Sequence, residues 1–333
     1  MINLGIIGTN WITHQFVDAA LDSGKYALSA VYSRKIETAQ EFACKHYGEI
    51  ACETELEDFL TTPRLDVVYI ASPNSLHFGQ AKAAIQAGKH VIVEKPAFST
   101  PKEMAEIIAL SKENKVFFFE AARNVHEESF KVIKESLPES KHIIGANFSY
   151  MKYSSRYDQV LEGQEPNIFS PHFSGGSLAD LGVYPIYAAL GWFGKPQEVH
   201  HFARKIATGV DGIGTAILRY ENYDVTIQHG KIGNSALPSE IYFDNGTLYL
   251  NAINAIEKAE LEIRGEETVE LEVTAKANPM IEEAINFAEI IQDPDNAENQ
   301  ARYQELLDLA RDVNEVLYEL RTQAGVHYAA DEE

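Results

Sequence analysis

The chain has 333 residues, of which 45% are hydrophobic and 23% charged, values that suit a soluble globular protein of two domains. Its net charge is −22, and such a surface repels nucleic acid and anionic membranes, so we expect neither as a partner. No apolar stretch has the length of a transmembrane helix, and Cys44 and Cys52 show no metal-ligand pattern, so we expect a cytoplasmic protein without a metal.

Short apolar runs alternate with amphipathic segments over roughly the first 120 residues, a pattern typical of βαβ units around a parallel sheet. Strands are predicted at Leu4–Ile7, Leu28–Tyr32, Val67–Ala71, Val91–Val93 and Val116–Phe119. Helices are predicted at Ile12–Leu21, Glu37–His46, His77–Ala87 and Thr100–Asn114. We therefore predict an α/β Rossmann domain with a mostly parallel sheet over residues 1–121.

Period-2 alternation replaces this pattern after about Arg123, which indicates half-buried strands. Strands are predicted at Ala146–Tyr150, Thr215–Tyr220 and Val225–His229, and a hairpin turning at Asn245-Gly246 between Ile241–Phe243 and Leu248–Leu250. Helices are predicted at Ser129–Ser136, Asp180–Leu190, Ile281–Ile291 and Arg302–Leu320. The prediction is an α+β domain with a large open antiparallel sheet over residues 122–333.

A loop of the kind that binds dinucleotides follows the first predicted strand. Its candidate cofactor-binding residues are Gly8, Thr9, Asn10, Trp11 and Ile12. Asn10 and Thr13 stand where the G-x-G-x-x-G pattern has its second and third glycines, and Asn tolerates left-handed backbone better than most residues. Backbone amides and the helix N-terminus would bind the pyrophosphate. A plain strand-to-helix turn explains this motif about as well.

The end of the second predicted strand carries Ser33, Arg34 and Lys35. A site that prefers NAD usually has Asp or Glu at this place for the ribose hydroxyls. Basic and hydroxyl side chains can instead bind a 2′-phosphate, so we expect NADP in preference to NAD. The alternative is two solvated charges at the start of a helix.

Glu94-Lys95-Pro96 ends another predicted strand, at the edge of the sheet where α/β folds bind ligands. Lysine is seldom buried without a partner or a task, and proline makes the turn stiff. The sequence therefore favours a functional role for Lys95, although a surface lysine in a tight turn has the same pattern.

Three segments together resemble one known family. They are Ser72-Pro73-Asn74-Ser75-Leu76-His77, Glu94-Lys95-Pro96 and Gly175-Gly176-Ser177-Leu178-Ala179-Asp180-Leu181-Gly182-Val183-Tyr184. In this order and spacing they resemble the Gfo/Idh/MocA family of glucose–fructose oxidoreductase, inositol dehydrogenase and dihydrodiol dehydrogenase. The resemblance implies a Rossmann domain followed by an open-sheet domain, a nicotinamide cofactor, and a homodimer or homotetramer formed through the antiparallel sheet.

The resemblance also implies roles for individual residues. Cofactor contacts are implied for Ser72, Pro73, Asn74, His77, Glu94 and Lys95. Lys95 matches the family lysine that lies at the nicotinamide and the substrate. Asp180 matches an aspartate of the family's sugar-alcohol dehydrogenases, which have a histidine four residues after it. Tyr184 replaces that histidine, as in the glucose–fructose oxidoreductase and dihydrodiol dehydrogenase branch, whose members often use NADP.

The implied reaction moves a hydride between nicotinamide and a carbinol carbon. A phenol exchanges its proton near neutrality only beside a cation, so we expect Tyr184 to be the acid/base with Lys95 as its partner. Asp180 would orient the pair if it lies one helical turn before Tyr184, a geometry that Pro185 disturbs if the helix begins near Gly182. The alternatives are a helix cap for Asp180 and a core aromatic for Tyr184.

Other positions are weaker candidates. His172, shortly before the double glycine, is a candidate for substrate binding. It could equally be a loop histidine without a functional role. Arg123 and Asn124 are possible pocket residues by position alone. His200 and His201 are adjacent on a predicted strand, so at most one of them faces inward.

Three functions fit these observations. The first is an NAD(P)-dependent oxidoreductase acting on a sugar, polyol or diol. The second is a non-catalytic regulatory protein that senses a dinucleotide, against which the retention of Lys95 and Tyr184 argues. The third is a redox-assisted cleavage of a glycosidic bond, which a side branch of the family carries out.

Overall fold

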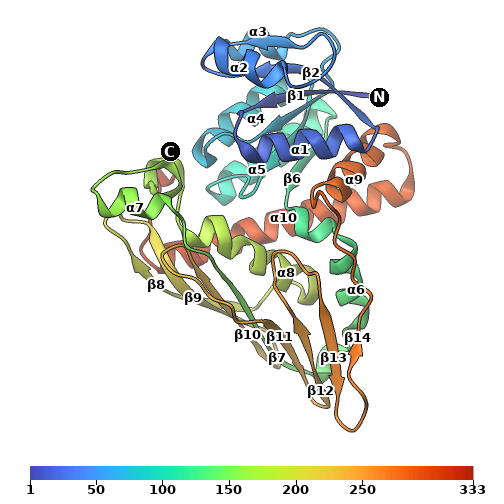
Figure 1. Ribbon diagram of the computed structural model, residues 1–333, viewed down its shortest axis with the longest axis vertical. Coiled ribbons are helices and arrows are strands. Elements are labelled where there is room, and N and C mark those ends of the chain that lie inside the picture. Colours follow the sequence, from blue (N-terminus) through green and yellow to red (C-terminus); the bar gives the residue numbers. More distant parts are fainter. Residues whose placement is uncertain (333) are drawn as a thin grey trace. The chain divides into compact units, whose positions relative to one another are not determined.

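Figure 1 shows the computed structural model of the protein, which describes residues 1–332. The chain forms two compact units. Unit 1 comprises Met1–Arg123 and Asn278–Arg311, and unit 2 comprises Asn124–Ala277 together with the residues from Asp312 onward. The prediction of one continuous second domain over residues 122–333 did not include the return of residues 278–311 to the first unit. No helix within residues 1–332 combines the length and the apolar composition needed to cross a membrane.

Unit 1 contains a six-stranded parallel sheet with the strand order β3-β2-β1-β4-β5-β6. Its strands are β1 (Ile2–Ile7), β2 (Tyr26–Tyr32), β3 (Ala51–Glu53), β4 (Val67–Ile70), β5 (His90–Glu94) and β6 (Phe118–Ala121). Its α-helices are α1 (Trp11–Asp22), α2 (Ile36–Ala43), α3 (Leu56–Leu60), α4 (His77–Gln86), α5 (Pro101–Asn114), α9 (Ile281–Gln292) and the first half of α10 (Ala297–Gln323). The order reverses between β1 and β4, and ligands bind at such a switch point in open α/β sheets.

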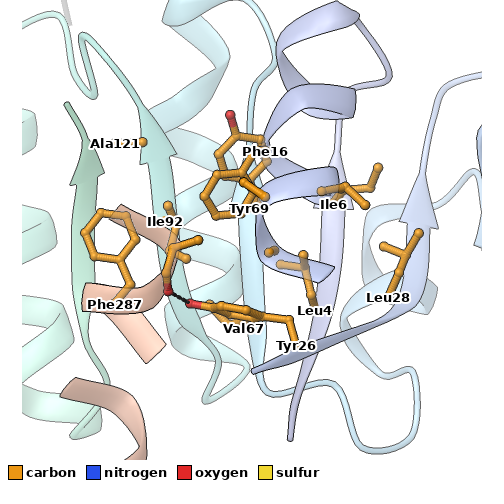
Figure 2. Packing of buried hydrophobic residues seen from close by; sticks show 14 of the residues in the cluster. Leu4, Ile6, Phe16, Tyr26, Leu28, Val67, Tyr69, Ile92, Ala121 and Phe287 are labelled. Carbon is orange, nitrogen blue, oxygen red and sulfur yellow. Dashed lines mark hydrogen bonds between the residues drawn. The ribbon is translucent and has the colours of Figure 1, made fainter. Parts of the chain in front are cut away.

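The two faces of this sheet are covered by different helices. Figure 2 shows one face, where Phe16 of α1 stacks on Tyr69 of β4 with ring centroids 3.9 Å apart and Phe287 of α9 packs beside β5 and β6. The Tyr26 hydroxyl donates to the carbonyl of Ala284, 2.9 Å away, and so ties α9 to this face. Side chains of α3, α4, α5 and α10 form the core on the other face. The apolar stripe of α9 explains why residues 278–311 belong to unit 1.

Local sequence signals account for most elements of unit 1. Thr100 and Glu103 form the capping box at the start of α5, and Pro101 is the first helical residue. Gly88 ends α4 with a left-handed φ of 73°. The short elements β3 and α3 were not predicted, because three and five residues are too few to show a periodicity. The last strand begins at Phe118, two residues later than the predicted Val116.

Unit 2 contains an eight-stranded sheet with the strand order β14-β13-β12-β11-β7-β10-β9-β8. Its strands are β7 (Ile143–Met151), β8 (Glu198–Lys205), β9 (Asp211–Arg219), β10 (Asp224–Gly230), β11 (Ser239–Phe243), β12 (Gly246–Leu250), β13 (Ala259–Ile263) and β14 (Val269–Glu270). All neighbouring pairs are antiparallel except β7 and β10. The predicted hairpin is β11 and β12, and its turn residues are Asp244 and Asn245, one residue earlier than predicted, because Gly246 already begins β12. The predicted fold class, a Rossmann domain with a second domain built on a large open sheet, is confirmed.

The helices of unit 2 include α6 (Glu128–Ser136), α7 (Arg156–Leu161) and α8 (Val183–Phe193), besides the second half of α10. A π-helical segment, η6 (Leu178–Gly182), leads directly into α8, and both lie against the sheet near β7 and β10. The single helix predicted over Asp180–Leu190 is therefore two helical segments. A Cβ atom on Gly182 would lie 3.2 Å from Cγ of His229, so the absence of a side chain there lets η6 approach β10 closely.

Candidate cofactor and active-site residues

The loop predicted to bind the pyrophosphate, which we call the phosphate loop, comprises Gly8, Thr9 and Asn10. It lies between β1 and α1, at the switch point of the unit 1 sheet. Gly8 has φ of 100°, and a Cβ atom there would lie 2.7 Å from the carbonyl oxygen of Ala71. Only glycine fits, because both the backbone conformation and the contact with the end of β4 exclude a side chain. This close backbone approach is a feature of loops that bind a dinucleotide pyrophosphate, so the loop fits the cofactor.

Asn10 has a different task from the one predicted. Its backbone is extended, with φ of −81°, and its side chain caps α1 by accepting from the amides of Ile12, 3.0 Å away, and Thr13, 3.3 Å away. Its Nδ2 donates to the carbonyl of Ala71 at 2.9 Å. The expectation that Asn10 replaces a glycine by adopting left-handed backbone is therefore wrong. The amides of Ile12 and Thr13 therefore already have an acceptor, and the predicted contacts of Thr9, Trp11 and Ile12 with the cofactor stay predictions.

Ser33, Arg34 and Lys35 follow β2 at the same edge of the sheet. Arg34 and Lys35 are exposed, and neither forms an ion pair within residues 1–332. The Ser33 hydroxyl accepts weakly from the Lys35 amide at 3.5 Å. Two exposed cations beside a hydroxyl are the donor set that a 2′-phosphate needs, so these residues fit NADP.

Glu94, Lys95 and Pro96 form a turn at the end of β5 that is held from several sides. The Tyr69 hydroxyl donates to Glu94 Oε1 at 2.6 Å, and the Lys95 amide donates to Glu94 Oε2 at 3.2 Å. The Ala97 amide donates to Oε1 of Glu120, 3.0 Å away. The Lys95–Pro96 peptide bond is cis, which the sequence did not reveal. Buried carboxylates on both sides thus fix the backbone that carries Lys95.

Glu94 was predicted among the cofactor contacts, yet its carboxylate serves this turn. It is buried, and burial raises its pKa, an effect that Lys95 and the Tyr69 hydroxyl oppose. Lys95 itself is partly exposed at the end of the strand. The structure therefore presents the lysine side chain, and not the glutamate, at the edge of the sheet.

His77 also braces the turn from inside unit 1. Its ring is 1% exposed, with Nε2 2.8 Å from the carbonyl of Ser72 and Nδ1 3.2 Å from the carbonyl of Ala97. Burial lowers the pKa of His77, while the surrounding carbonyls raise it. Because both ring nitrogens face backbone carbonyls, His77 connects the loop after β4 to the turn after β5. It was predicted to contact the cofactor, and this geometry instead makes it a support for Lys95.

The rest of the loop after β4 is partly exposed. The Ser72 hydroxyl donates to Gln80 Oε1 at 2.6 Å, Pro73 precedes the short 3₁₀ turn η1 (Asn74–Leu76), and Asn74 begins it. These residues lie beside the phosphate loop, since β4 pairs with β1 and the Gly8 position faces Ala71. Their predicted contacts with the cofactor stay predictions.

The signature segment of unit 2 presents two side chains. From Leu178 to Leu190 every residue is buried except Asp180 and Tyr184. Pro185 lies in the first turn of α8, where a missing amide proton costs little, so it does not separate the two. The Tyr184 ring packs edge-on against Tyr150, with centroids 5.6 Å apart, and its carbonyl accepts from Asn124 Nδ2 at 3.4 Å. Tyr184 is therefore not a fully buried core aromatic, whereas the predicted role of Asp180 in orienting it stays a prediction, because α8 begins only at Val183.

Asp180 has a partner that the sequence analysis missed. Lys231, just after β10, forms an ion pair with Asp180 Oδ2, and its ammonium lies 5.7 Å from the centre of the Phe169 ring. Lys231 is 4% exposed, so its charge needs this carboxylate. Asp180 is consequently the ion-pair partner of a buried lysine and not merely a helix cap. The available signal was a charged residue at the end of an apolar strand, the same signal that marked Lys95.

The positions of the remaining candidate residues do not indicate a role in the site. His172 is exposed on the 3₁₀ turn η5 (Pro171–Phe173), which the Ser170 hydroxyl caps, and its role in substrate binding stays a prediction. Arg123 begins the 3₁₀ turn η2 (Arg123–His126) in unit 1. His201 faces inward and His200 outward, as the alternation along β8 predicted. No group of His, Cys, Asp or Glu within residues 1–332 has the arrangement of a metal site.

Comparison with known proteins identifies the family. Residues 2–122 match the oxidoreductase family with an NAD-binding Rossmann fold, and residues 147–249 match the GFO/IDH/MocA C-terminal domain. The uncharacterized oxidoreductase YgjR of Escherichia coli is 39% identical, with 99% of both chains covered. The chain belongs to the Gfo/Idh/MocA oxidoreductase family. The family prediction is confirmed, and with it an oxidoreductase that uses NAD(P).

One further relative and one solved structure resemble the chain over its whole length. The scyllo-inositol 2-dehydrogenase (NADP(+)) IolU of Bacillus subtilis is 37% identical, with 100% of both chains covered. The solved structure of KijD10, a 3-ketoreductase from Actinomadura kijaniata in complex with NADP and TDP-benzene, superimposes with a TM-score of 0.82 over 97% of both chains. At 21% identity this last likeness concerns the fold alone.

Proposed function

We propose that the protein is an NADP-dependent dehydrogenase or reductase acting on the CH–OH group of a cyclic polyol, sugar or diol. The observation that carries this proposal is the full-length similarity to an NADP-dependent scyllo-inositol 2-dehydrogenase. A trans-1,2-dihydrobenzene-1,2-diol dehydrogenase of Danio rerio is 26% identical over 67% of this chain and 66% of its own. Both named substrates are rings with neighbouring hydroxyls, so we propose a cyclic vicinal diol as the substrate class.

In this proposal Lys95 and Tyr184 handle charge and proton. When bound, the nicotinamide supplies or accepts the hydride. Lys95 donates a hydrogen bond to the substrate oxygen and stabilises the charge that develops on it during the reaction. Tyr184 takes the hydroxyl proton in oxidation and returns it in reduction.

Asp180 orients the reacting pair and is itself paired with Lys231. The rigidity of the turn around Lys95 supports its role, because positioned groups contribute most when they need no rearrangement. His77, Glu94 and Glu120 provide that rigidity through the hydrogen bonds described above.

The first test is turnover with both cofactors. Scyllo-inositol, myo-inositol, a trans-dihydrodiol and common aldoses are incubated with NADP⁺ or NAD⁺, and absorbance of the reduced nicotinamide is followed. Oxidation of a cyclic vicinal diol with NADP⁺ supports the proposal. Tight binding of NADPH without turnover on this panel or on glycosides would instead favour a dinucleotide-sensing regulator.

Arg34→Ala is expected to weaken NADPH binding by about 10–100-fold and to leave NADH binding nearly unchanged, because a hydrogen bond to a charged group contributes about 1.5–3 kcal/mol. Calorimetric titration of both cofactors measures this. Lys45→Ala, which removes an exposed cation near the end of α2, is the matched control. Equal losses for NADPH and NADH would show that Arg34 does not recognise the 2′-phosphate.

We propose further that the protein forms a homodimer or homotetramer through the sheet of unit 2. One face of this sheet carries buried apolar side chains that include Phe148, Ile227 and Leu248. The opposite face carries Phe202, which is 70% exposed, and partly exposed apolar side chains such as Ile217. An open face of this kind is typical of an association surface.

Phe202→Asp is expected to shift the protein from oligomer to monomer, because a carboxylate in such an interface would lose its hydration without gaining a partner. Light scattering after size-exclusion chromatography measures the mass. Leu161→Asp, at an exposed leucine on α7, serves as the control for adding a charge to an exposed apolar position. A monomeric wild-type protein at high concentration would overturn this assembly.

A further inference from the structure

Beneath the signature segment of unit 2, four buried side chains form a continuous hydrogen-bonded row. Asp211 Oδ2 lies 2.7 Å from the Ser177 hydroxyl, and that hydroxyl lies 2.8 Å from His229 Nδ1. His229 Nε2 lies 2.8 Å from His201 Nε2, and His201 Nδ1 lies 3.0 Å from the carbonyl of Leu320. We call the four residues the proton chain: Asp211, Ser177, His229 and His201. The most exposed of them is 6% accessible to solvent.

The distances between the polar atoms of the proton chain determine how many hydrogens it must contain. It contains four contacts between polar atoms, counting the one to Leu320, and each contact needs one hydrogen. An ionised Asp211 with two neutral rings and one hydroxyl supplies only three, so two acceptors would face each other at a distance of a hydrogen bond. One additional proton satisfies every contact. It also makes the buried row neutral, which avoids the cost of burying an uncompensated carboxylate.

The additional proton can reside at either end. With the proton on Asp211, the carboxyl donates to Ser177, Ser177 to His229, His229 to His201, and His201 to Leu320. If the protons of Asp211, Ser177 and His229 each move across the next hydrogen bond of the row, Asp211 becomes a carboxylate and His201 an imidazolium. The number of protons does not change. Burial lowers the pKa of His201, and that of His229 to about 4, while the nearby Asp211 opposes both shifts.

Two charged groups of neighbouring elements already have partners of opposite charge. Asp180 on η6 is paired with Lys231, and Arg321 on α10 is paired with Asp331. The Tyr328 hydroxyl donates to the carbonyl of Gly175 at 2.8 Å, and burial, together with Asp211, raises its pKa. Every charged or titratable group named here therefore has its own partner.

We propose that the proton chain holds one proton in common and that this proton fixes the position of η6, the segment carrying Asp180. The link is direct, because the amide of Leu178, the first residue of η6, donates to Asp211 Oδ2 at 2.6 Å and Ser177 immediately precedes it. Lys231 follows His229 by two residues, so the same strand end carries the partner of Asp180. Asp211, Ser177, His229 and His201 are positioning residues, and their effect on Asp180 rests on the proposed function, whereas the proton count does not.

The test is the pH dependence of unfolding, which needs no substrate. Between about pH 7.5 and 9 the unfolded residues bind almost no proton, while the folded proton chain binds one. Stability contributed by this proton is thus lost as the pH rises, and the unfolding equilibrium constant increases about tenfold per pH unit. In Asp211→Asn an amide nitrogen facing Ser177 supplies this hydrogen without a titratable group, at the cost of the acceptor for the Leu178 amide. The increase is therefore expected to fall below about twofold per pH unit. Urea unfolding followed by fluorescence measures both slopes.

His142→Gln is the matched control, since it removes an exposed histidine that lies 2.7 Å from a carboxylate, that of Asp244. It should keep the wild-type slope. Equal slopes for wild type and Asp211→Asn would overturn the proposal. Should Asp211→Asn not fold, ¹⁵N NMR of the histidine rings in the wild type decides. Protonation of His201 at Nδ1 with His229 protonated at Nε2, or a doubly protonated His201, supports the shared proton. A neutral His201 beside a His229 protonated only at Nδ1 overturns it.

Once a substrate is known, a further measurement tests the link to the reaction. Asp211→Asn should lower kcat while leaving NADPH affinity intact, because the cofactor loop belongs to unit 1. Absence of turnover in the wild type would count against the proposed function and leave the unfolding result standing.

Discussion

Lys95→Met is expected to reduce turnover by about 10²–10⁴-fold while NADPH binding is largely kept, the range found when a group that handles a proton or a developing charge is removed. Methionine preserves the length and apolar stem of the side chain, so the cis turn and its hydrogen bonds to Glu94, Glu120 and His77 can persist. Steady-state kinetics with a cyclic diol and NADP⁺ give the loss, and titration with NADPH gives the affinity.

The control for this change is Lys82→Met on α4, which removes a half-exposed lysine paired with Glu106 and belongs to the same unit. It should retain wild-type kinetics. Turnover of Lys95→Met within a small factor of wild type would exclude Lys95 from the reaction. An equal loss of NADPH affinity would mean that the lysine serves the cofactor and not the substrate oxygen.

Much of the fold was predictable because its signals are local. The capping box at Thr100 and Glu103 and the hairpin of β11 and β12 each depend on a few adjacent residues. The return of residues 278–311 to unit 1 depends on packing between Ala284 and Tyr26, separated by 258 residues along the chain. No window of sequence contains that information.

The candidate site was predictable to the extent that its motifs end strands. Lys95 and Gly8 both lie at strand ends and were found in this way. His77 and Glu94 were assigned to the cofactor although their side chains brace the turn, because a motif identifies a residue without giving the direction of its side chain. Lys231 and the proton chain were missed, since their parts come from separate strands of unit 2 that only the folded sheet brings together.

The two units also differ in how they hold charge. In unit 1 the buried carboxylates of Glu94 and Glu120 accept from backbone amides and so fix a turn. In unit 2 the buried carboxylate of Asp211 accepts from the Leu178 amide and joins a row of side chains that shares a proton in our proposal. In our proposal the conformation of the second region should therefore respond to the shared proton.

Gly8→Ala is expected to lower NADPH affinity by about 10–100-fold, equivalent to about 1.4–2.8 kcal/mol, and to destabilise unit 1. A methyl group at this position would lie 2.7 Å from the carbonyl oxygen of Ala71, which is backbone and cannot rotate away. The loop must therefore move from β4, and Asn10, whose Nδ2 donates to the same carbonyl, would move with it. Calorimetry with NADPH and urea unfolding measure the two effects.

The control separates this contact from the cost of the backbone conformation itself. Gly48 has φ of 112°, and a Cβ atom there would meet nothing within 4 Å. Gly48→Ala should therefore lose only the roughly 1–2 kcal/mol that a left-handed conformation costs an L-residue, with NADPH affinity unchanged. If Gly8→Ala and Gly48→Ala behave alike in both measurements, the contact with Ala71 does not shape the loop. A larger loss for Gly8→Ala alone would assign the cofactor site to the close approach of β1 and β4, where the strand order reverses.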